Sequence, residues 1–336
     1  MRVICFILSS VIILSCNERK DSTNTNLTDS PYTLDTAWNQ VSNSYVVSQP
    51  TGIGLDKFDH IFVFQRTGRK WTEPFPDSLI SQNTVIELDN ETGKLINSWG
   101  ANHFIMPHGL AVDKDNNVWV TDVALQQIFK FSHEGKLLMK LGIAKEPGND
   151  SLHFNLPTDI AFADDGTFYV SDGYGNSRVV KFSSSGKFIK SWGTYGSKPG
   201  EFIIPHGIAI DGKNIIYVAD RQNNRIQLFD TSGTFLKEVK NDMLVEQLPS
   251  VAIDLNNTLF AIDYDPTTKS DSTVNGSTFF RIDTSLYPTT HFGATGLPKR
   301  VSSWFHDIAI DSKGNIYIGD IHGLKVLKFR NAKSLQ

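Results

Sequence analysis

The stretch PHGLAVDKDNNVWVTD, residues 107–122, contains two apolar alternations separated by a turn-forming segment, and an aspartate follows each alternation. It recurs as PHGIAIDGKNIIYVAD at residues 205–220. Apolar residues that alternate with a period of two, bounded by Asn, Asp and Gly, are typical of β-strands joined by tight turns. The stretch therefore predicts a β-hairpin that the chain uses more than once.

Copies of this unit begin at six positions, which are Pro50, Pro107, Pro157, Pro205, Pro249 and Phe305. The starts are 57, 50, 48, 44 and 56 residues apart, a spacing typical of propellers and solenoids. Full units continue with a third and a fourth strand, such as residues 178–182 and 187–192. Six units of four antiparallel strands predict an all-β fold, a six-bladed β-propeller over residues 32–332.

The two ends of the chain are expected to close this ring together. The sixth unit stops near Phe329, after its third strand, and residues 34–41 upstream of the first unit have the pattern of a strand. We expect this N-terminal strand to complete blade six, because a bare strand edge would promote aggregation.

The first residues have the pattern of an export signal. The apolar run within residues 1–15 is too short to span a bilayer. Residues 13–16, ILSC, resemble a bacterial lipobox, which implies lipidation of Cys16; the alternative is an ordinary signal peptide with an incidental cysteine. Residues 16–31 are polar and predict a tether. We expect an exported, monomeric bacterial lipoprotein, in the periplasm or at the cell surface, held to the outer membrane by its lipid alone.

Composition limits the classes of partner and metal. Of 336 residues, 40% are apolar and 20% are charged, and the net charge of -4 argues against nucleic-acid binding. Both cysteines, Cys5 and Cys16, precede the propeller. Any metal in the propeller must therefore use histidines and carboxylates.

One position can be compared across all six units, the residue just before each innermost strand. It carries Thr51, His108, Thr158, His206, Ser250 and His306. Histidine thus occupies alternate units, so three imidazoles should approach the channel axis about 120° apart, as three ligands of one metal would. The alternative is three unrelated channel-lining histidines. Three nitrogen ligands without a thiolate favour zinc, and other divalent metals remain open.

A second position, just after the aspartate that ends the second strand, carries Arg66 in unit one and Arg221 in unit four. These units face each other across the ring. Two guanidinium groups near a metal form a site for a substrate carboxylate; the alternative is surface arginines paired with nearby acids. The aspartate itself recurs in nearly every unit, so we interpret it as structural.

These residues resemble those of the peptidyl-α-hydroxyglycine α-amidating lyase family, over roughly residues 45–330. The most specific stretches are residues 106–113, 119–125, 170–178, 218–221 and 306–308. The resemblance implies a zinc site at His108, His206 and His306, a catalytic tyrosine at Tyr174, and two active-site arginines at Arg66 and Arg221. It also implies a structural calcium held by the carbonyl groups of Ile53 and Leu110 and the side chain of Asp307.

The sequence departs from the family in two places near this site. Animal members have a cysteine where this chain has Gly175, and a Met-Pro pair where it has Trp304 and Phe305. In addition, the six units account for the sequence after the tether, so we expect the hydroxylated substrate to come from another protein.

The reaction implied by the resemblance splits a peptidyl-α-hydroxyglycine into a peptide amide and glyoxylate. Zinc would act as a Lewis acid and Tyr174 as the general base. Arg66 or Arg221 would stabilise the phenolate, and the other would hold the substrate carboxylate. One alternative is a non-catalytic NHL-repeat propeller that binds protein or glycan, which would not need alternating histidines. Another is a lactonase-like hydrolase, but imidazoles are poor ligands for the calcium that such enzymes use.

Overall fold

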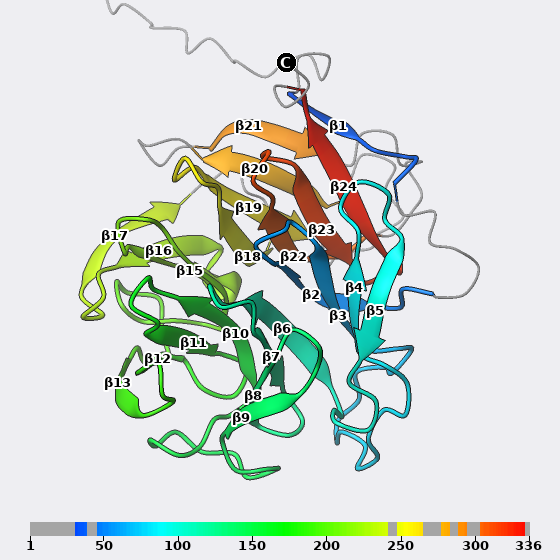
Figure 1. The fold of residues 1–336 in the computed structure, drawn as a ribbon. Coiled ribbons are helices and arrows are strands. Elements are labelled where there is room, and N and C mark those ends of the chain that lie inside the picture. The colour runs from blue at the N-terminus through cyan, green and yellow to red at the C-terminus, as the bar shows by residue number, and fades with distance from the viewer. Residues whose placement is uncertain are drawn as a thin grey trace, which may run out of the picture. The chain divides into compact units, whose positions relative to one another are not determined.

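The computed structural model describes residues 31–38, 46–240, 247–264, 277–282, 288–293 and 303–332. Strands in these ranges form six sheets of four antiparallel strands, arranged as blades around a central channel (Figure 1). The predicted all-β, six-bladed β-propeller is therefore confirmed. The predicted signal peptide, Cys16 and the tether up to residue 30 lie outside the described residues. Among the residues that are described, no helix is long and apolar enough to cross a membrane.

In blades one to five the strands run from the channel outward in chain order. Blade one contains β2 (Pro50–Leu55), β3 (Ile61–Gln65), β4 (Val85–Leu88) and β5 (Leu95–Trp99); blade two contains β6 (Pro107–Val112), β7 (Val118–Asp122), β8 (Gln127–Phe131) and β9 (Leu137–Leu141); blade three contains β10 (Pro157–Phe162), β11 (Phe168–Asp172), β12 (Arg178–Phe182) and β13 (Phe188–Trp192). Blade four contains β14 (Pro205–Ile210), β15 (Ile216–Asp220), β16 (Arg225–Phe229) and β17 (Phe235–Lys240), with the short 3-10 helix η2 (Arg221–Asn223) after β15. Blade five contains β18 (Gln247–Ile253), β19 (Leu259–Tyr264), β20 (Thr278–Ile282) and β21 (Pro288–Gly293), and blade six contains β22 (Phe305–Ile310), β23 (Ile316–Asp320) and β24 (Lys325–Asn331).

The fourth strand of blade six is β1 (Tyr32–Leu34), which pairs antiparallel with β24 and lies beside it in Figure 1. The expected closure by an N-terminal strand is therefore confirmed, but its predicted position at residues 34–41 was wrong. The strand ends at Leu34 because the next residue, Asp35, accepts the backbone N–H groups of Ala37 and Trp38 at 3.2 Å and turns the chain. Residues 39–41 of the predicted strand lie outside the described residues.

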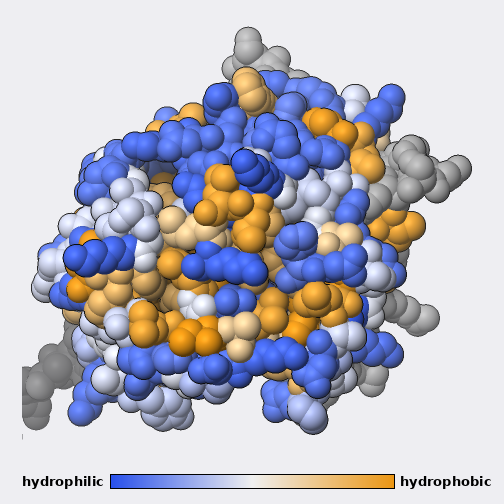
Figure 2. Space-filling model, turned by 60° about the horizontal axis from the view of Figure 1, so that its bottom comes forward, coloured by the Kyte–Doolittle hydropathy of each residue, from blue (hydrophilic) through white to orange (hydrophobic). Residues whose placement is uncertain are grey.

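Burial follows the position of each strand in its blade. The second strands of blades one to four and six, for example β7 and β11, are buried throughout, because both of their faces pack against neighbouring blades. Outer strands expose part of their apolar side chains, such as Ile96, Leu138 and Ile189. Figure 2 shows one face of the molecule, where apolar residues lie between polar ones. The core is thus made of contacts between successive blades.

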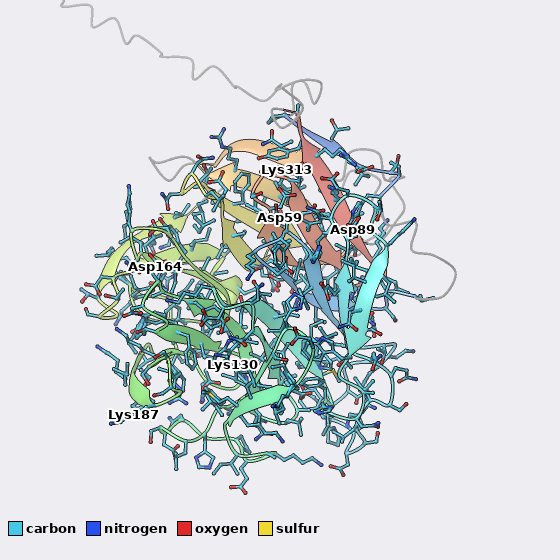
Figure 3. The ribbon with its side chains drawn as sticks, in the orientation of Figure 1. Asp59, Asp89, Lys130, Asp164, Lys187 and Lys313 are labelled. Carbon is cyan, nitrogen blue, oxygen red and sulfur yellow. The ribbon has the colours of Figure 1, made fainter. Side chains whose placement is uncertain are left out.

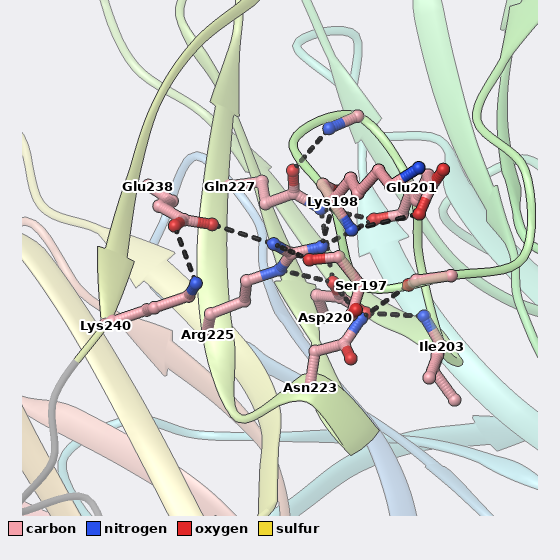
Figure 4. A network of polar contacts seen from close by, with 12 residues as sticks. Ser197, Lys198, Glu201, Ile203, Asp220, Asn223, Arg225, Gln227, Glu238 and Lys240 are labelled. Carbon is pink, nitrogen blue, oxygen red and sulfur yellow. Dashed lines mark hydrogen bonds and ion pairs between the residues drawn. The ribbon is translucent and has the colours of Figure 1, made fainter.

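The recurring aspartate at the end of the second strand fixes the loop that enters its blade. In blade four, Asp220 accepts the Nε–H of Arg225 at 2.7 Å and the backbone N–H of Ile203 at 2.8 Å. Arg225 is 1% exposed and also binds Glu238 at 2.8 Å (Figure 4). In blade two, Asp122 accepts the backbone N–H groups of Ile105, Met106 and Leu125 instead. These buried carboxylates are paired or hydrogen-bonded, as burial of a charge requires.

Candidate metal centre and active site

Each of the three predicted zinc ligands lies where an innermost strand departs from regular pairing. The register of β6 with β7 shifts between Pro107 and Leu110, and β14 and β22 have the same irregularity at their first residues. A bulge re-aims side chains that regular pleating would direct into a sheet face. His108, His206 and His306 therefore point into the channel although they belong to strands.

The channel brings these histidines together. The ring centroids of His108 lie 4.7 Å from those of His206 and His306, and the latter two are 4.9 Å apart. One ligating nitrogen from each ring lies within 4.8 Å of the others. All three residues are buried. This is an arrangement that can hold a single metal ion with three nitrogen ligands.

A backbone carbonyl of the following blade orients each imidazole. The Nδ1 atom of His108 is 2.8 Å from the carbonyl oxygen of Thr158, and that of His306 is 2.6 Å from the carbonyl oxygen of Thr51. His206 has the same contact with Pro249 at 2.7 Å. A proton on Nδ1 leaves the lone pair of Nε2 free, which is the tautomer that a metal ligand requires.

Burial keeps these rings neutral. It lowers the pKa of His108 and His206 well below the usual range, and the neighbouring His306 contributes to the shift of both. Burial, followed by the charge of Arg66, lowers the pKa of His306 to about 3. Neutral imidazoles in a site with no thiolate suit zinc or another divalent transition metal.

Tyr174 lies directly over the histidines. Its phenol oxygen is 3.1 Å from Nε2 of His108 and 3.0 Å from Nε2 of His206. Nη1 of Arg221 donates to the same oxygen at 3.1 Å. The phenol therefore lies at the edge of the metal position and next to a cation, where a base for a bound substrate would have to lie.

The two arginines differ in their contacts. The Arg221 guanidinium also stacks on the Tyr174 ring at 5.2 Å, and its Nε is buried with no hydrogen-bond partner among the described residues. Arg66 donates from Nε to the carbonyl oxygen of Pro107 at 3.1 Å and lies over the ring of Trp71. Burial lowers the pKa of Arg66 to about 10, so it stays positive at neutral pH.

Aromatic side chains that the sequence analysis did not identify form the walls of the site. The Trp71 ring lies 5.2 Å from that of Tyr174 and 4.9 Å from that of Phe75. Trp304, which was noted only as a departure from the family, stacks on Tyr264 at 4.3 Å. Trp71 and Phe75 lie in the loop between β3 and β4, outside the repeat, so comparison between units could not reveal them.

Two carboxylates face each other deeper in the channel. Asp307 accepts the backbone N–H of Ile53 at 2.7 Å and the hydroxyl of Ser250 at 2.7 Å. Burial raises the pKa of Asp307 to about 7, and burial together with the negative charge of Asp307 raises that of Asp159 well above its usual range. Sequence analysis missed Asp159, although it occupies the same place in unit three that Asp307 occupies in unit six, one residue after the compared position.

The predicted calcium ligands are close to each other in this layer. Ile53 contacts Asp307 through its N–H, and the backbones of β2 and β6 touch, since a Cβ atom on Gly52 would lie 2.5 Å from the nitrogen of Leu110. Two buried carboxylates that face each other offer the oxygen ligands that a hard divalent cation prefers. The residues present therefore fit a calcium ion.

The residue that replaces the cysteine of animal relatives is closely packed. A Cβ atom on Gly175 would lie 2.1 Å from Oδ1 of Asn155. On the other side of Tyr174, a Cβ atom on Gly173 would lie 1.9 Å from the carbonyl oxygen of Pro205. The small residues on both sides let the Tyr174 loop approach its neighbours closely.

Comparisons with known proteins agree with this fold. A family model described as a 6-bladed beta-propeller matches residues 148–297, and an NHL repeat model matches residues 104–131. Among solved structures, one described as a streptogramin B lyase structure has a TM-score of 0.58 and 14% identity, and the match covers 89% of this chain and 97% of that one. At this identity the likeness shows the fold alone.

Curated proteins of related sequence match most of this chain. The chain is 36% identical over 319 residues to "Peptidyl-glycine alpha-amidating monooxygenase B" of Xenopus laevis, covering 89% of this chain and 36% of that protein. It is 32% identical over 335 residues to "Peptidyl-alpha-hydroxyglycine alpha-amidating lyase 1" of Drosophila melanogaster, covering 89% and 59%. The chain thus spans less than two thirds of the length of these curated relatives. It is similar to these two proteins over most of its own length.

Proposed function

We propose that this protein is a zinc-dependent lyase that cleaves a peptidyl-α-hydroxyglycine, or a small carbinolamide of the same kind, into an amide and glyoxylate. The observation that carries this proposal is the position of the Tyr174 phenol oxygen, within hydrogen-bond distance of two histidine Nε2 atoms and of Arg221. A non-catalytic binding propeller has no need for this convergence. The names of the relatives support the same reaction class.

In this reaction Tyr174 takes the proton of the substrate hydroxyl. The carbinol carbon becomes the aldehyde carbon of glyoxylate as its bond to nitrogen breaks, and the electron pair goes to the nitrogen. Protonation of that nitrogen, by Tyr174 or by water, completes the amide. General acid–base catalysis of this kind accelerates a reaction by about 10²–10⁴-fold.

The two arginines make different contacts, so we assign a different role to each. Arg221 lies against the phenol oxygen, so it stabilises the phenolate. The terminal nitrogens of Arg66 have no hydrogen bond to the protein among the described contacts, and the planar fork binds carboxylates in pairs of parallel bonds. Arg66 therefore holds the substrate carboxylate, with Trp71 packed on the guanidinium.

The three histidines would hold the zinc ion, since their Nδ1 atoms are engaged and their Nε2 atoms converge. When bound, the metal supplies Lewis acidity that favours loss of the hydroxyl proton. Asp307, with Asp159 facing it, would hold a structural calcium with help from the carbonyl groups of Ile53 and Leu110.

Metal analysis of the purified protein, combined with glyoxylate release from α-hydroxyhippurate, tests this proposal. We expect about one zinc at the centre and zinc-dependent glyoxylate formation. Replacement His108→Ala should remove that zinc and the activity, and the matched replacement of a half-buried histidine outside this group of three, His153→Gln, should change neither. A zinc-loaded wild-type protein that is inactive on every such substrate would favour the binding propeller instead.

We further propose that the chain acts as an exported, monomeric lipoprotein anchored through Cys16. The support is the lipobox-like sequence of residues 13–16 and the polar residues that follow. The variant Cys16→Ser should appear in the soluble fraction, and the matched variant Cys5→Ser should remain with the membrane. Firm membrane association of Cys16→Ser would contradict lipidation at this residue.

A further inference from the structure

A second cluster of histidines and carboxylates lies away from the channel centre, between blades one and two. Asp56 and His60 belong to the turn that joins β2 to β3, at the end of β2 opposite to Thr51. Glu87 lies in β4, and His133 lies in the turn after β8 of blade two. None of these residues contributes to the proposed lyase reaction.

Four contacts link the ligating atoms of this cluster. Nδ1 of His60 is 3.2 Å from Oδ2 of Asp56 and 3.1 Å from Oε1 of Glu87. Nε2 of His133 is 2.9 Å and 3.7 Å from the same two oxygens. Four ligands at zinc bond lengths of 2.0–2.2 Å in a tetrahedron lie about 3.3–3.6 Å apart. Three of these separations are slightly shorter than that value and one is slightly longer. Asp56, His60 and Glu87 each offer a ligand atom within 4.8 Å of the others, and His133 joins them through its contacts with the two carboxylates.

Blade one lacks the usual aromatic partner of its aspartate, as does blade five, where Phe260 takes the place of the donor for Asp254. In three other blades one oxygen of the equivalent aspartate accepts backbone N–H groups of the turn, and the second accepts an aromatic N–H or O–H from the next strand. The aspartates are Asp113, Asp211 and Asp311, and their partners are Trp119, Tyr217 and Tyr317. In blade one, Asp56 keeps the turn contacts, but the aromatic residue is Phe62, which has no donor.

The third strand of blade one has changed in the same place. The residue that pairs with this aromatic position is Lys130 in blade two, Lys181 in blade three, Leu228 in blade four, Arg281 in blade five and Lys328 in blade six. Lys130, labelled in Figure 3, binds Asp113 at 3.1 Å. In blade one the residue is Glu87. Glu87 is therefore an acid at a position where four of the other five blades have a cation.

Two carboxylates thus converge where blade two has the Lys130–Asp113 ion pair, and their side chains are 0% and 4% exposed. Buried carboxylates need a positive partner at close range. Here the partners are two imidazoles, with side chains 29% and 24% exposed, and Nδ1 of His60 forms no regular hydrogen bond despite its close contacts. The carboxylate oxygens are thus buried, and the two more exposed histidines lie on the solvent side, from which an ion would enter.

We propose that Asp56, His60, Glu87 and His133 form a second metal site, which binds a divalent transition-metal ion such as zinc. Two imidazoles and two carboxylates form a donor set that suits zinc and provides its charge balance. The site joins the first hairpin of blade one to a turn of blade two, so a bound ion would link the two blades.

Zinc titration of the chelator-treated full-length protein tests this site. We expect wild-type protein to bind one zinc more than the double variant His60→Gln/His133→Gln. The variant His108→Ala, which lacks a ligand of the central site, should still bind one zinc with mixed nitrogen and oxygen ligands by X-ray absorption. Equal zinc binding by wild type and the double variant would overturn the proposal.

Two further variants keep the test decisive if the double variant folds poorly. Glu87→Gln keeps the shape of the side chain and removes its charge, and it should weaken zinc binding at this site at least tenfold, the lower end for disturbing a metal site. His153→Gln is the matched control, because His153 also contacts two carboxylates, at 2.8 Å and 3.8 Å, but on an exposed loop. Unchanged zinc affinity in Glu87→Gln, or the same loss in His153→Gln, would contradict the proposed site. The lyase rate at the central site should be unchanged in Glu87→Gln.

Discussion

The proposed reaction depends most on one side chain, Tyr174, because its phenol contacts both the histidine layer and Arg221. The contacts come from three blades, so they exist only after the ring has formed. The alternating histidines carry no such information by themselves, since three converging imidazoles would also suit a purely structural metal.

Replacement Tyr174→Phe removes one oxygen and leaves the ring that packs against Trp71. If the phenolate is the base, glyoxylate release should fall by about 10²-fold or more with little change in KM or zinc content. Steady-state kinetics with metal analysis measure all three. A variant that keeps its rate per folded molecule would show that Tyr174 only packs over the site.

Substitutions of the two arginines should affect different kinetic parameters. Arg66→Lys removes the fork that holds the carboxylate, and the loss of a charge-assisted hydrogen bond of about 1.5–3 kcal/mol should raise KM about tenfold or more. Arg221→Lys should act chiefly on kcat, because this arginine faces the phenol oxygen. Arg69→Lys is the control, since Arg69 binds Ser78 in an exposed part of the same loop. If Arg66→Lys lowered chiefly kcat and Arg221→Lys raised chiefly KM, the two arginines would have the opposite roles.

For single residues, comparison between repeat units can single out only those that differ from their equivalents. His108, Arg66 and Arg221 are such residues, and the structure brings them into one channel region. Asp159 occupies a comparable position but was not compared, and Trp71 lies in a loop that no other unit contains. The Asp159 and Asp307 carboxylates face each other only because the ring is closed. No local sequence pattern shows this arrangement.

Among the secondary-structure elements, the short strand β1 contacts both blade five and blade six. It covers the edge of β24, and its Tyr32 ring packs edge-on against Phe260 and Phe279 of blade five, at centroid distances of 6.1 Å and 5.7 Å. The side chain of Asp35 also binds Arg330 at 2.6 Å. The sequence predicted such a strand, but the alternation around Trp38 placed it too far along the chain. The strand ends earlier because the side chain of Asp35 forms hydrogen bonds that turn the chain.

Deletion of residues 32–35 should therefore expose β24 and separate the two ends of the chain. We expect a lower Tm and association that increases with protein concentration, since an unpaired edge is a template for strand pairing. Thermal unfolding and light scattering measure these effects. Deletion of four tether residues, 22–25, is the control and should change neither; a deletion of β1 without effect would mean that blade six is stable with three strands.

For the molecule as a whole, the channel contains two layers with opposite responses to pH. The histidines are neutral because burial lowers their pKa values, and the carboxylates of Asp159 and Asp307 resist ionisation because burial raises theirs. The pKa of Asp307, about 7, exceeds that of an unfolded aspartate, about 3.9. Its contribution to stability is therefore complete below about pH 4 and is lost as pH rises through 7.

Calcium should reverse this loss, because it binds the ionised carboxylates and relieves their repulsion. In zinc-loaded protein, calcium should thus raise Tm more at pH 8 than at pH 6, where protons compete for Asp307. Differential scanning calorimetry with calcium or with a calcium-selective chelator measures the difference. An equal shift at both pH values would show that calcium does not bind these carboxylates.

The number of blades itself has a consequence for what the channel can contain. The histidines come from every second blade, whereas Asp159 and Asp307 come from blades three and six, directly opposite each other. The first set has approximate threefold symmetry and the second approximate twofold symmetry about the same axis. Six is the smallest ring size divisible by both numbers. A propeller with seven blades could present neither set evenly around its axis. The number of blades therefore limits which arrangements of ligands the channel can contain.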